Sequence, residues 1–296
     1  MIAAEHERVS VFGIDIDRVT LNSAAARLTD WVESGDRHCR YVVTPNLDHV
    51  LLYQEDAALR QAYADASLVV ADGWPLVTAS RMSGRPLPER VAGSDLVPGV
   101  FSEIERRGVT RTVFLLGAAA GVADAAADVI HSRWSNVEVV GTYSPPLGFE
   151  HDSCETSKIN NLINEKSPDV LIVGFGAPKQ ELWLQRFHKQ LDVKIALAGG
   201  ATIDFLAGRQ TRAPEWVRRM RLEWSHRLLT NPTRLARRYT KNAFALPGLL
   251  MQEWKGTVGA TPGSSLHKHS EMLLANHVQG VPVRINYGSQ PERDHC

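Results

Sequence analysis

The feature that most constrains this fold is the alternation of short apolar runs with segments of helical spacing. The apolar runs are rich in β-branched residues and do not alternate with polar ones, which is typical of strands buried on both faces. They predict strands at residues 9–14, 40–44, 67–71, 112–117, 137–143, 169–176 and 193–200. The segments with helical spacing between them are 21–34, 47–65, 95–107, 121–134, 155–166 and 179–190.

This alternation predicts an α/β fold with a Rossmann-like, doubly wound parallel sheet. A chain of 296 residues, 44% of them hydrophobic, is long enough for one such domain with a sizeable core and a small appendage. In sheets of this kind, ligands bind beyond the carboxyl ends of the strands. The residues that directly follow each predicted strand are therefore the first candidates for a functional site.

Charge and hydropathy narrow the possible partners. The formal net charge is zero, with 33 basic and 33 acidic side chains, so overall charge gives no reason to expect nucleic acid as a partner. No run of about 18 apolar residues predicts a membrane-spanning helix. The N-terminal residues also lack the basic segment and long apolar run of a signal peptide. We expect a cytoplasmic protein that contacts the inner face of the cell membrane only peripherally; homo-oligomerisation is left open.

The composition changes after about residue 208. Residues 209–241 contain nine arginines and one lysine against two glutamates, and a helix with Trp216 and Trp224 is predicted to start at Pro214. Such helices can lie on an anionic lipid surface. The alternative is a helix docked on its own domain with a solvated basic face. The predicted units are an α/β domain at 1–208, a basic helical, membrane-associating appendage at 209–254 and a disordered tail at 255–296.

Polar residues directly follow two of the predicted strands. Thr44 and Asn46 follow the strand at 40–44, and Asp72 and Gly73 follow the next one. A hydroxyl and an amide suit binding of sugar hydroxyls, and a carboxylate at a strand end suits general base catalysis near neutral pH. Proline, asparagine and Asp-Gly are also ordinary turn residues, so turn chemistry is the alternative at both places.

A third motif precedes the helix predicted at 95–107. Ser94 is the expected N-cap of that helix, with Gly93 before it, and Arg90 lies just ahead. The Arg90 guanidinium could pair with phosphate. The alternative is a solvated surface arginine. The next strand–glycine–helix unit, at 113–130, is similar to nucleotide-binding units but lacks GxGxxG, so it indicates the fold more than the function.

The strongest local motif is GFGAPKQE at 174–181. Its glycines let the backbone approach a ligand closely, and its proline begins a helix whose free N–H groups attract anions. The first turn then carries a cation, an amide and a carboxylate; the alternative is a well-capped helix. The residues of this motif that we expect to bind a ligand are Gly174, Gly176, Pro178, Lys179, Gln180 and Glu181.

The last strand candidate ends in Gly199 and Gly200, and Thr202 could cap a short helix after it. Asp204 could bind a base or a ribose. It could equally cap the helix or pair with a nearby arginine, and the sequence does not separate these roles. No DxD or CxxC pair accompanies any of the motifs, so no metal site is predicted.

The motifs together resemble the WecG/TagA/CpsF glycosyltransferases, glycosyltransferase family 26, in order and spacing over about residues 9–250. The GxGxPKQE helix start and the RAPEW…EW…RLL run are the most specific parts. The matching segments are TPN (44–46), ADG (71–73), RVAGSDL (90–96), GFGAPKQELW (174–183) and the run at 199–239.

This resemblance implies transfer of a sugar from a UDP-sugar donor to a lipid-diphosphate-linked sugar acceptor on undecaprenol, with inversion at the anomeric carbon. N-acetylmannosamine is the commonest donor sugar in the family, and some members use glucose or another hexose. The implied setting is synthesis of surface polysaccharide or teichoic acid at an anionic membrane surface. The resemblance implies no metal ion or other cofactor.

The resemblance also assigns residue roles. The family's proposed base falls on Asp72, and its supporting polar residues fall on Thr44, Arg90 and Gln180. Arginines of the appendage would neutralise the leaving diphosphate, and those expected to do so are Arg212, Arg219 and Arg227.

Two other readings compete with this one. A nicotinamide-dependent oxidoreductase on the same sheet predicts GxGxxG after the first strand, where Gly13 stands alone. A non-enzymatic scaffold that binds anionic lipid through residues 209–254 explains the appendage but leaves the motif at 174–181 without a role. Binding of UDP would separate a glycosyltransferase from a scaffold.

Overall fold

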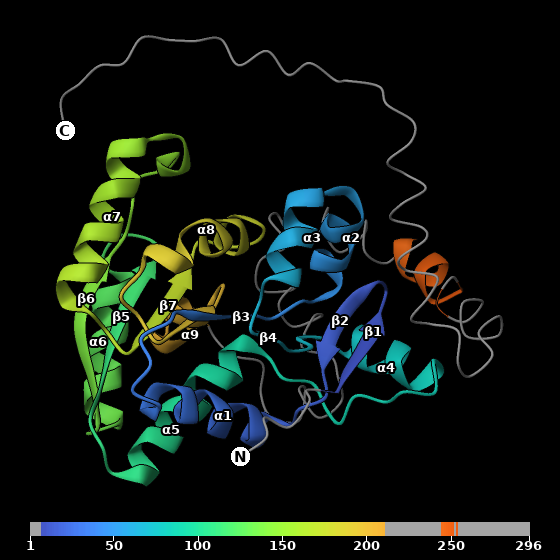
Figure 1. Ribbon diagram of the computed structural model, residues 1–296, viewed down its shortest axis with the longest axis horizontal. Coiled ribbons are helices and arrows are strands. Elements are labelled where there is room, and N and C mark those ends of the chain that lie inside the picture. The colour runs from blue at the N-terminus through green and yellow to red at the C-terminus, as the bar shows by residue number, and fades with distance from the viewer. Residues whose placement is uncertain (1–6, 211–243, 252, 254–296) are drawn as a thin grey trace.

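The centre of the fold is a six-stranded sheet in which every neighbouring pair of strands is parallel (Figure 1). The computed structural model describes residues 7–210, 244–251 and 253. The strand order is β4-β3-β8-β7-β5-β6. The prediction of an α/β fold with a parallel sheet is confirmed. The strands are β3 (Arg40–Val43), β4 (Leu68–Val69), β5 (Arg111–Gly117), β6 (Val137–Tyr143), β7 (Val170–Gly174) and β8 (Ile195–Ala198).

Helices cover both faces of this sheet. Successive strand residues point to opposite faces, so Val170 and Ile172 of β7 lie in one core while Leu171 and Val173 lie in the other. Continuous apolar strands are therefore required, as the sequence indicated. The first core contains α1 (Leu21–Glu33), α5 (Gly93–Arg107), α6 (Val122–Arg133) and α9 (Thr202–Leu206). The second contains α2 (Leu47–Glu55), α3 (Ala57–Ala64), α4 (Trp74–Met82), α7 (Ser153–Lys166) and α8 (Lys179–Phe187). Short 3-10 helices are η1 (Phe149–His151) and η2 (His188–Gln190).

The strand predicted at 9–14 is confirmed only over residues 9–11, and it lies outside the parallel sheet. The chain forms a separate antiparallel hairpin, β1 (Arg8–Val11) and β2 (Ile14–Asp17), with Phe12 and Gly13 at positive φ in its turn. An apolar run shows no break where the turn falls, because Phe12 is itself hydrophobic. The hairpin is attached to the sheet by the buried carboxylate of Asp17, which accepts a bond from the Val69 N–H at 2.9 Å.

Two helix boundaries also differ from the sequence prediction. The segment 47–65 is two helices, because the Asp56 side chain accepts bonds from the N–H groups of Ala58 and Leu59 and caps a new helix there. The N-cap of α5 is Ala92, which offers no side-chain bond, and not Ser94.

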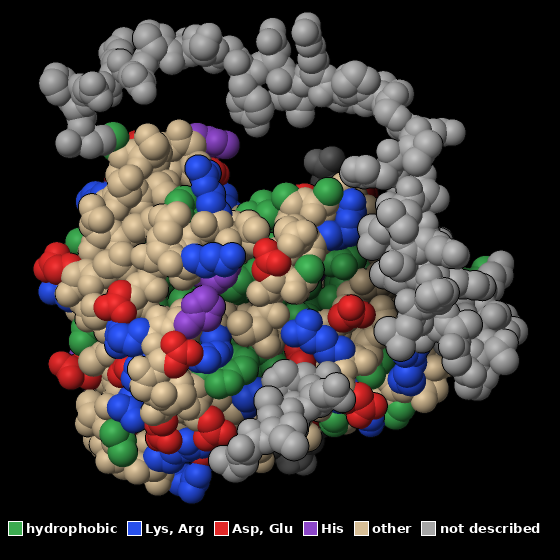
Figure 2. Space-filling view, viewed as in Figure 1, with side chains coloured by type: hydrophobic (Ala, Val, Ile, Leu, Met, Phe, Trp, Pro, Cys, Tyr) green, Lys and Arg blue, Asp and Glu red, His purple; other side chains and the backbone are tan. Residues whose placement is uncertain are grey.

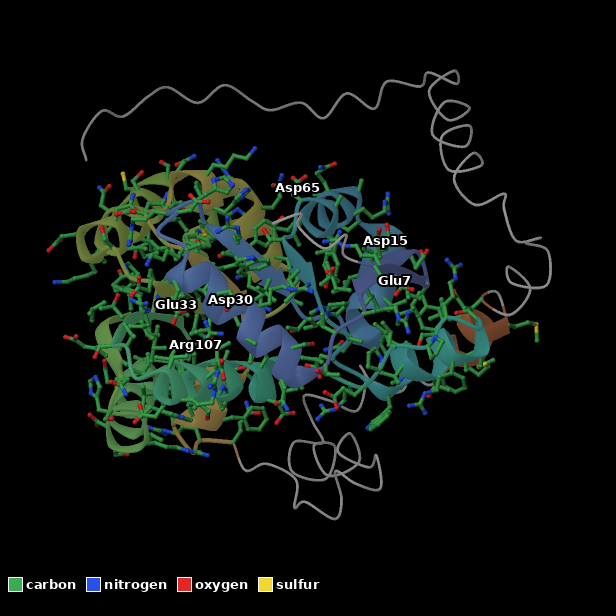
Figure 3. The ribbon with its side chains drawn as sticks, turned by 60° about the horizontal axis from the view of Figure 1, so that its bottom comes forward. Glu7, Asp15, Asp30, Glu33, Asp65 and Arg107 are labelled. Carbon is green, nitrogen blue, oxygen red and sulfur yellow. The ribbon has the colours of Figure 1, made fainter. Side chains whose placement is uncertain are left out.

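The packing of α1 against α5 is fixed by one arginine (Figure 3). Arg107, in the last turn of α5, lies 2.8 Å from both Asp30 and Glu33 of α1 and 2.9 Å from Glu103 of its own helix. A cation in the last turn also suits the negative end of the helix dipole. This ion-pair group lies on a helix pair and carries structure rather than chemistry.

Part of the predicted appendage is described. Residues 244–251 are helical (Figure 1). Leu249 and Leu250 of this helix pack against the second core. Glu253 accepts a bond from the Phe12 N–H at 3.0 Å, which attaches this segment to the β1–β2 turn. Phe244 and Met251 are 87% and 56% exposed. The described residues contain no helix long and apolar enough to cross a membrane. The helix expected from Pro214 and the tail at 255–296 lie outside the described residues.

Candidate active site

The residues that follow the strands meet at one edge of the sheet. The Asp72 N–H donates to the Pro45 carbonyl at 2.8 Å, and the Val91 N–H donates to the Ala71 carbonyl at the same distance. The Thr44 hydroxyl donates to the carbonyl of Ala198, the last residue of β8, at 3.4 Å. The loops after β3, β4 and β8 and the segment before α5 therefore converge, as expected for the carboxyl ends of parallel strands.

Asp72 belongs to a group of charges on this edge. The Arg90 guanidinium lies 3.4 Å from an Asp72 oxygen and 3.0 Å from an oxygen of Asp95, in the first turn of α5. The side chains are only 16%, 28% and 19% exposed for Arg90, Asp72 and Asp95, respectively. One guanidinium thus spans two carboxylates and fixes how the Asp72 carboxylate is oriented. Asp95 was not singled out from the sequence, although it lies inside the RVAGSDL motif.

The residues around this group have clear local roles. The Asn46 side-chain oxygen caps α2 by accepting bonds from the N–H groups of Asp48 and His49, so the turn-and-cap interpretation holds for that oxygen. A Cβ at Gly93 would lie 3.3 Å from the Thr44 hydroxyl, so glycine allows α5 to start against β3. Gly73 is extended and lies beside Asn46.

Glycines shape the neighbouring turns after β7 and β8. Gly176 and Gly200 have φ values of +79° and +53°, which residues other than glycine adopt only at a cost in free energy. A Cβ at Gly174 would lie 3.1 Å from the Gly200 carbonyl oxygen, so the two turns are in close contact. Gly117, at the end of β5, is a residue that the sequence did not single out. A Cβ there would lie 2.7 Å from the Gly174 backbone.

Gln180 joins these two turns. Pro178 is the N-cap of α8, and Gln180 lies in its first turn with only 2% of its surface exposed. Its side-chain oxygen accepts bonds from the Gly176 and Gly200 N–H groups, each at 3.1 Å. Its side-chain nitrogen donates to Glu181 at 2.9 Å.

The two charged residues of the same motif are both engaged within the protein. Glu181 is fully buried, and burial raises the pKa of its carboxyl group to about 7, against smaller lowering effects of bonds from Gln180 and its own backbone. Lys179 forms an ion pair with Glu150, and that lysine lowers the pKa of Glu150 through a hydrogen bond. The Lys179 ammonium also lies 5.8 Å from the centre of the Phe149 ring.

The remaining predicted site residues are less closely tied to the edge. Asp204 lies in α9, and its backbone carbonyl accepts bonds from the N–H groups of Arg209 and Gln210. Thr202 begins α9 without capping it, because its hydroxyl donates to the Gly199 carbonyl and the N-cap is Ala201. The arginines expected to contact the leaving diphosphate lie outside the described residues, and they are Arg212, Arg219 and Arg227.

The described surface and its acidic side chains add two observations. On the face shown in Figure 2, the basic and acidic side chains of the described residues are interspersed rather than gathered by sign. Within residues 7–210 and the described C-terminal segment, no three His, Cys, Asp or Glu side chains form a group that could hold a metal ion.

In an open parallel sheet, ligands bind beyond the carboxyl ends of the strands, which is where these glycine turns and the acid–arginine group lie. The chain belongs to the WecG/TagA/CpsF family of glycosyl transferases, whose family model matches residues 9–258. The resemblance stated from the motifs is thereby confirmed.

Two relatives from Staphylococcus aureus carry the name N-acetylglucosaminyldiphosphoundecaprenol N-acetyl-beta-D-mannosaminyltransferase. The protein of strain MRSA252 is 27% identical over 230 residues, which are 78% of this chain and 87% of the relative. The protein of strain NCTC 8325 / PS 47 is 26% identical over the same shares of the two chains. The similarity therefore extends over most of both proteins.

Proposed function

We propose that this chain transfers N-acetylmannosamine from a UDP-sugar to N-acetylglucosamine carried on undecaprenyl diphosphate, in the synthesis of a cell-envelope polymer. Membership of a glycosyltransferase family supports the class of reaction. The names of the two relatives support the two sugars and the lipid carrier. The observation that carries the site assignment is the Asp72–Arg90–Asp95 group beside the glycine turns.

In the proposed reaction, an acceptor hydroxyl oxygen attacks the anomeric carbon of the donor sugar. Its proton passes to the Asp72 carboxylate, and the bond from the anomeric carbon to the UDP oxygen breaks, with its electron pair leaving on UDP. Attack from the side opposite UDP inverts the anomeric carbon. Arg90 orients Asp72, and Thr44 and Gln180 are the supporting polar residues.

The leaving UDP gains negative charge that must be stabilised in the transition state. We assign this role to Arg212, Arg219 and Arg227 together with the positive end of the α8 helix dipole. The reaction would then need no metal ion. The support for this is the arginine content of residues 209–241 and the lack of a DxD pair beside any of the site motifs.

The same segment supports a peripheral position at the inner face of the cell membrane. Nine arginines in residues 209–241 would attract anionic lipid, and the exposed Phe244 and Met251 would add apolar contact. Salt-sensitive binding to anionic liposomes is the expected result. Binding that is equal with neutral and anionic liposomes, or absent at low salt, would contradict it.

The test of the function is a transfer assay with the full chain. Purified protein is offered a panel of UDP-sugars with a short-chain polyprenyl-diphosphate N-acetylglucosamine, and release of UDP is followed with and without a chelator. UDP release that needs both UDP-N-acetylmannosamine and the acceptor, and that continues in the chelator, is the expected outcome. Release with a different donor sugar would correct the substrate, and no UDP binding at all would contradict the proposal.

A further inference from the structure

The orientation of the Gln180 amide is settled by its neighbours. The N–H groups of Gly176 and Gly200 can only donate, and both point to the same end of the Gln180 side chain at 3.1 Å. That end must therefore be the carbonyl oxygen, and the amide nitrogen must face the other way. The nitrogen then meets the Glu181 carboxyl oxygen at 2.9 Å.

Burial of the Glu181 carboxyl group costs free energy because the group is removed from water. It is fully buried, and its second carboxyl oxygen has no hydrogen-bond partner among the described residues. On this side of the core lies Tyr63 of α3, whose hydroxyl is bonded to His49 of α2 at 2.8 Å. The pKa of Tyr63 is raised by burial and then by Glu181, so the two groups are close. An apolar side chain of similar volume would avoid this desolvation.

We propose that Glu181 is a positioning residue for the transfer reaction, which fixes the Gln180 amide so that its oxygen holds the Gly176 and Gly200 backbones together. This inference rests on the proposed glycosyl transfer and adds a role behind the site. Gln180 is then primarily the clamp between two turns, because its oxygen is already occupied by two backbone N–H groups. Glu181 acts through Gln180 and does not contact substrate.

The Gln180 clamp matters because the two glycine turns have no side chains of their own to hold them in place. Gly176 and Gly200 carry no side chains, and a Cβ at either would meet no heavy atom closer than 4.0 Å, so little packing holds these two positions. The turn after β8 also contacts the other half of the site, since Gly93 and Thr44 lie against Gly199 and Ala198. Loss of the clamp should therefore misplace groups at the reacting centre more than it weakens binding.

The test compares two substitutions at one position with the full chain. Glu181→Leu removes the acceptor for the Gln180 nitrogen and also removes the buried carboxyl group. We expect kcat to fall by about tenfold or more with little change in KM, while the melting temperature stays the same or rises. Glu181→Gln keeps an acceptor oxygen, so it should retain most of the wild-type kcat.

Leu184→Ala is the matched control on the same helix, where Leu184 is fully buried. It should lower the melting temperature and leave kcat per folded molecule unchanged. Wild-type kcat in Glu181→Leu would overturn the proposal. An equal loss in Glu181→Gln and Glu181→Leu would also overturn it, because the acceptor oxygen would not be the reason.

Hydrogen exchange tests the clamp without relying on turnover. The Gly176 and Gly200 amides should exchange slowly in the wild type and in Glu181→Gln, and faster in Glu181→Leu and Gln180→Ala. If the wild type transfers no sugar, the proposed function fails while this measurement still decides the clamp. Equal protection of both amides in all four proteins would show that Gln180 is not held in this way.

Discussion

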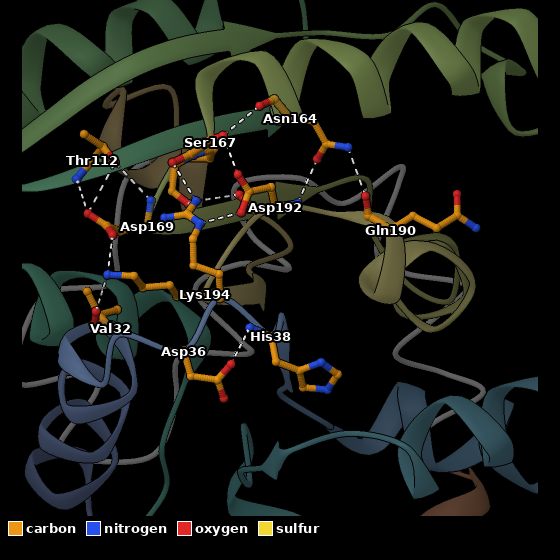
Figure 4. Close-up of polar contacts among 12 residues, drawn as sticks. Val32, Asp36, His38, Thr112, Asn164, Ser167, Asp169, Gln190, Asp192 and Lys194 are labelled. Carbon is orange, nitrogen blue, oxygen red and sulfur yellow. Dashed lines mark hydrogen bonds and ion pairs between the residues drawn. The ribbon is translucent and has the colours of Figure 1, made fainter.

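The two edges of the parallel sheet differ in how their charged side chains are paired. At the amino edge, Asp169 accepts bonds from the N–H and hydroxyl of Thr112 and pairs with Lys194 at 2.9 Å, while Lys194 also reaches the Val32 carbonyl (Figure 4). Arg37 bridges Asp192 and the Ser167 carbonyl in the same way. Each of these charges pairs with an opposite charge, so the network ties loops together.

The carboxyl edge is built differently. Its turns are made by glycines, one arginine spans two carboxylates, and a buried carboxyl oxygen of Glu181 has no partner among the described residues. Polar groups arranged at some cost to stability are typical of functional sites. We therefore expect substitutions of these paired charges at the amino edge to lower stability, and substitutions of Asp72 or Arg90 at the carboxyl edge to lower activity.

The largest expected effect is that of Asp72→Asn at the carboxyl edge. Asparagine keeps the shape of the side chain and the backbone bond to Pro45 but cannot accept the acceptor's proton. We expect kcat to fall by about 10²–10⁴-fold, as measured by UDP release, with an unchanged circular dichroism spectrum and melting curve. A folded variant with full activity would remove Asp72 from the mechanism.

The stability of variants at the two edges should also depend on pH in opposite ways. Below the ordinary pKa of 4.5, the Glu181 carboxyl is protonated in both the folded and the unfolded chain. Between 4.5 and about 7 only the unfolded chain loses this proton, so wild-type stability falls as pH rises, and above about 7 the loss is complete. Tyr63, the neighbouring titratable group, has a raised pKa and does not titrate in this range.

The free energy of unfolding of Glu181→Gln relative to the wild type should therefore rise from pH 5 to about pH 7, by up to about 3 kcal/mol, and then level off. Denaturant unfolding at several pH values measures it. Asp192→Asn at the amino edge is the control with the opposite sign. The hydrogen bonds from Arg37 and Ser167 lower the pKa of Asp192, so that variant should lose stability relative to the wild type at neutral pH and less so in acid. A constant difference across pH for both variants would contradict this account.

Arg90→Ala should lower kcat by about tenfold to a hundredfold, because charge-assisted bonds to Asp72 and Asp95 are lost and Asp72 is no longer oriented. The control is Arg37→Ala at the amino edge, which removes an arginine of similar pairing. Its kcat per folded molecule should equal that of the wild type. If both arginine variants lose the same fraction of activity, the two edges do not differ in the proposed way.

The smallest expected effect is that of Lys194→Met at the amino edge. It leaves Asp169 without its cation, and both side chains are largely buried, at 14% and 12% exposed for Asp169 and Lys194. We expect a loss of about 2 kcal/mol in stability, seen as a fall of roughly 4–8 °C in melting temperature. Activity per folded molecule should not change. A large loss of kcat without a loss of stability would contradict the assignment of Lys194 to stability alone.

The six parallel strands could be predicted because a strand buried on both faces must be continuously apolar, as Val170–Val173 and Ile195–Ala198 are within the predicted strands. The same rule failed at 9–14, where an apolar run contains a hairpin turn at Phe12. It also failed at 47–65, where a side-chain cap at Asp56 divides a pattern that is periodic throughout. A turn with Phe12 and Gly13 at positive φ decided the first case and the Asp56 cap decided the second, and hydrophobic periodicity reports neither.

The location of the site could be predicted because the carboxyl ends of parallel strands share one edge, which brings Thr44, Asp72 and Gly200 into one region. The side-chain partners of these residues could not be predicted. The pairing of Arg90 with Asp95, the contact of Gly117 with the Gly174 backbone and the burial of Glu181 all depend on how elements distant in sequence pack. In the first turn of a helix, a buried glutamate and a capping glutamate look the same in sequence.

The most direct test of the central claim is to analyse the transfer product of three proteins side by side. Wild type, Asp72→Asn and Lys194→Met are each given UDP-N-acetylmannosamine and a short-chain polyprenyl-diphosphate N-acetylglucosamine, and the lipid product is identified by mass spectrometry. Equal amounts of folded protein are used at a temperature where all three are stable. We predict a lipid product with the mass of the disaccharide from the wild type and from Lys194→Met, and almost none from Asp72→Asn. Product formation by Asp72→Asn at the wild-type rate would contradict this prediction. A failure of all three proteins to form product with any UDP-sugar would also contradict it.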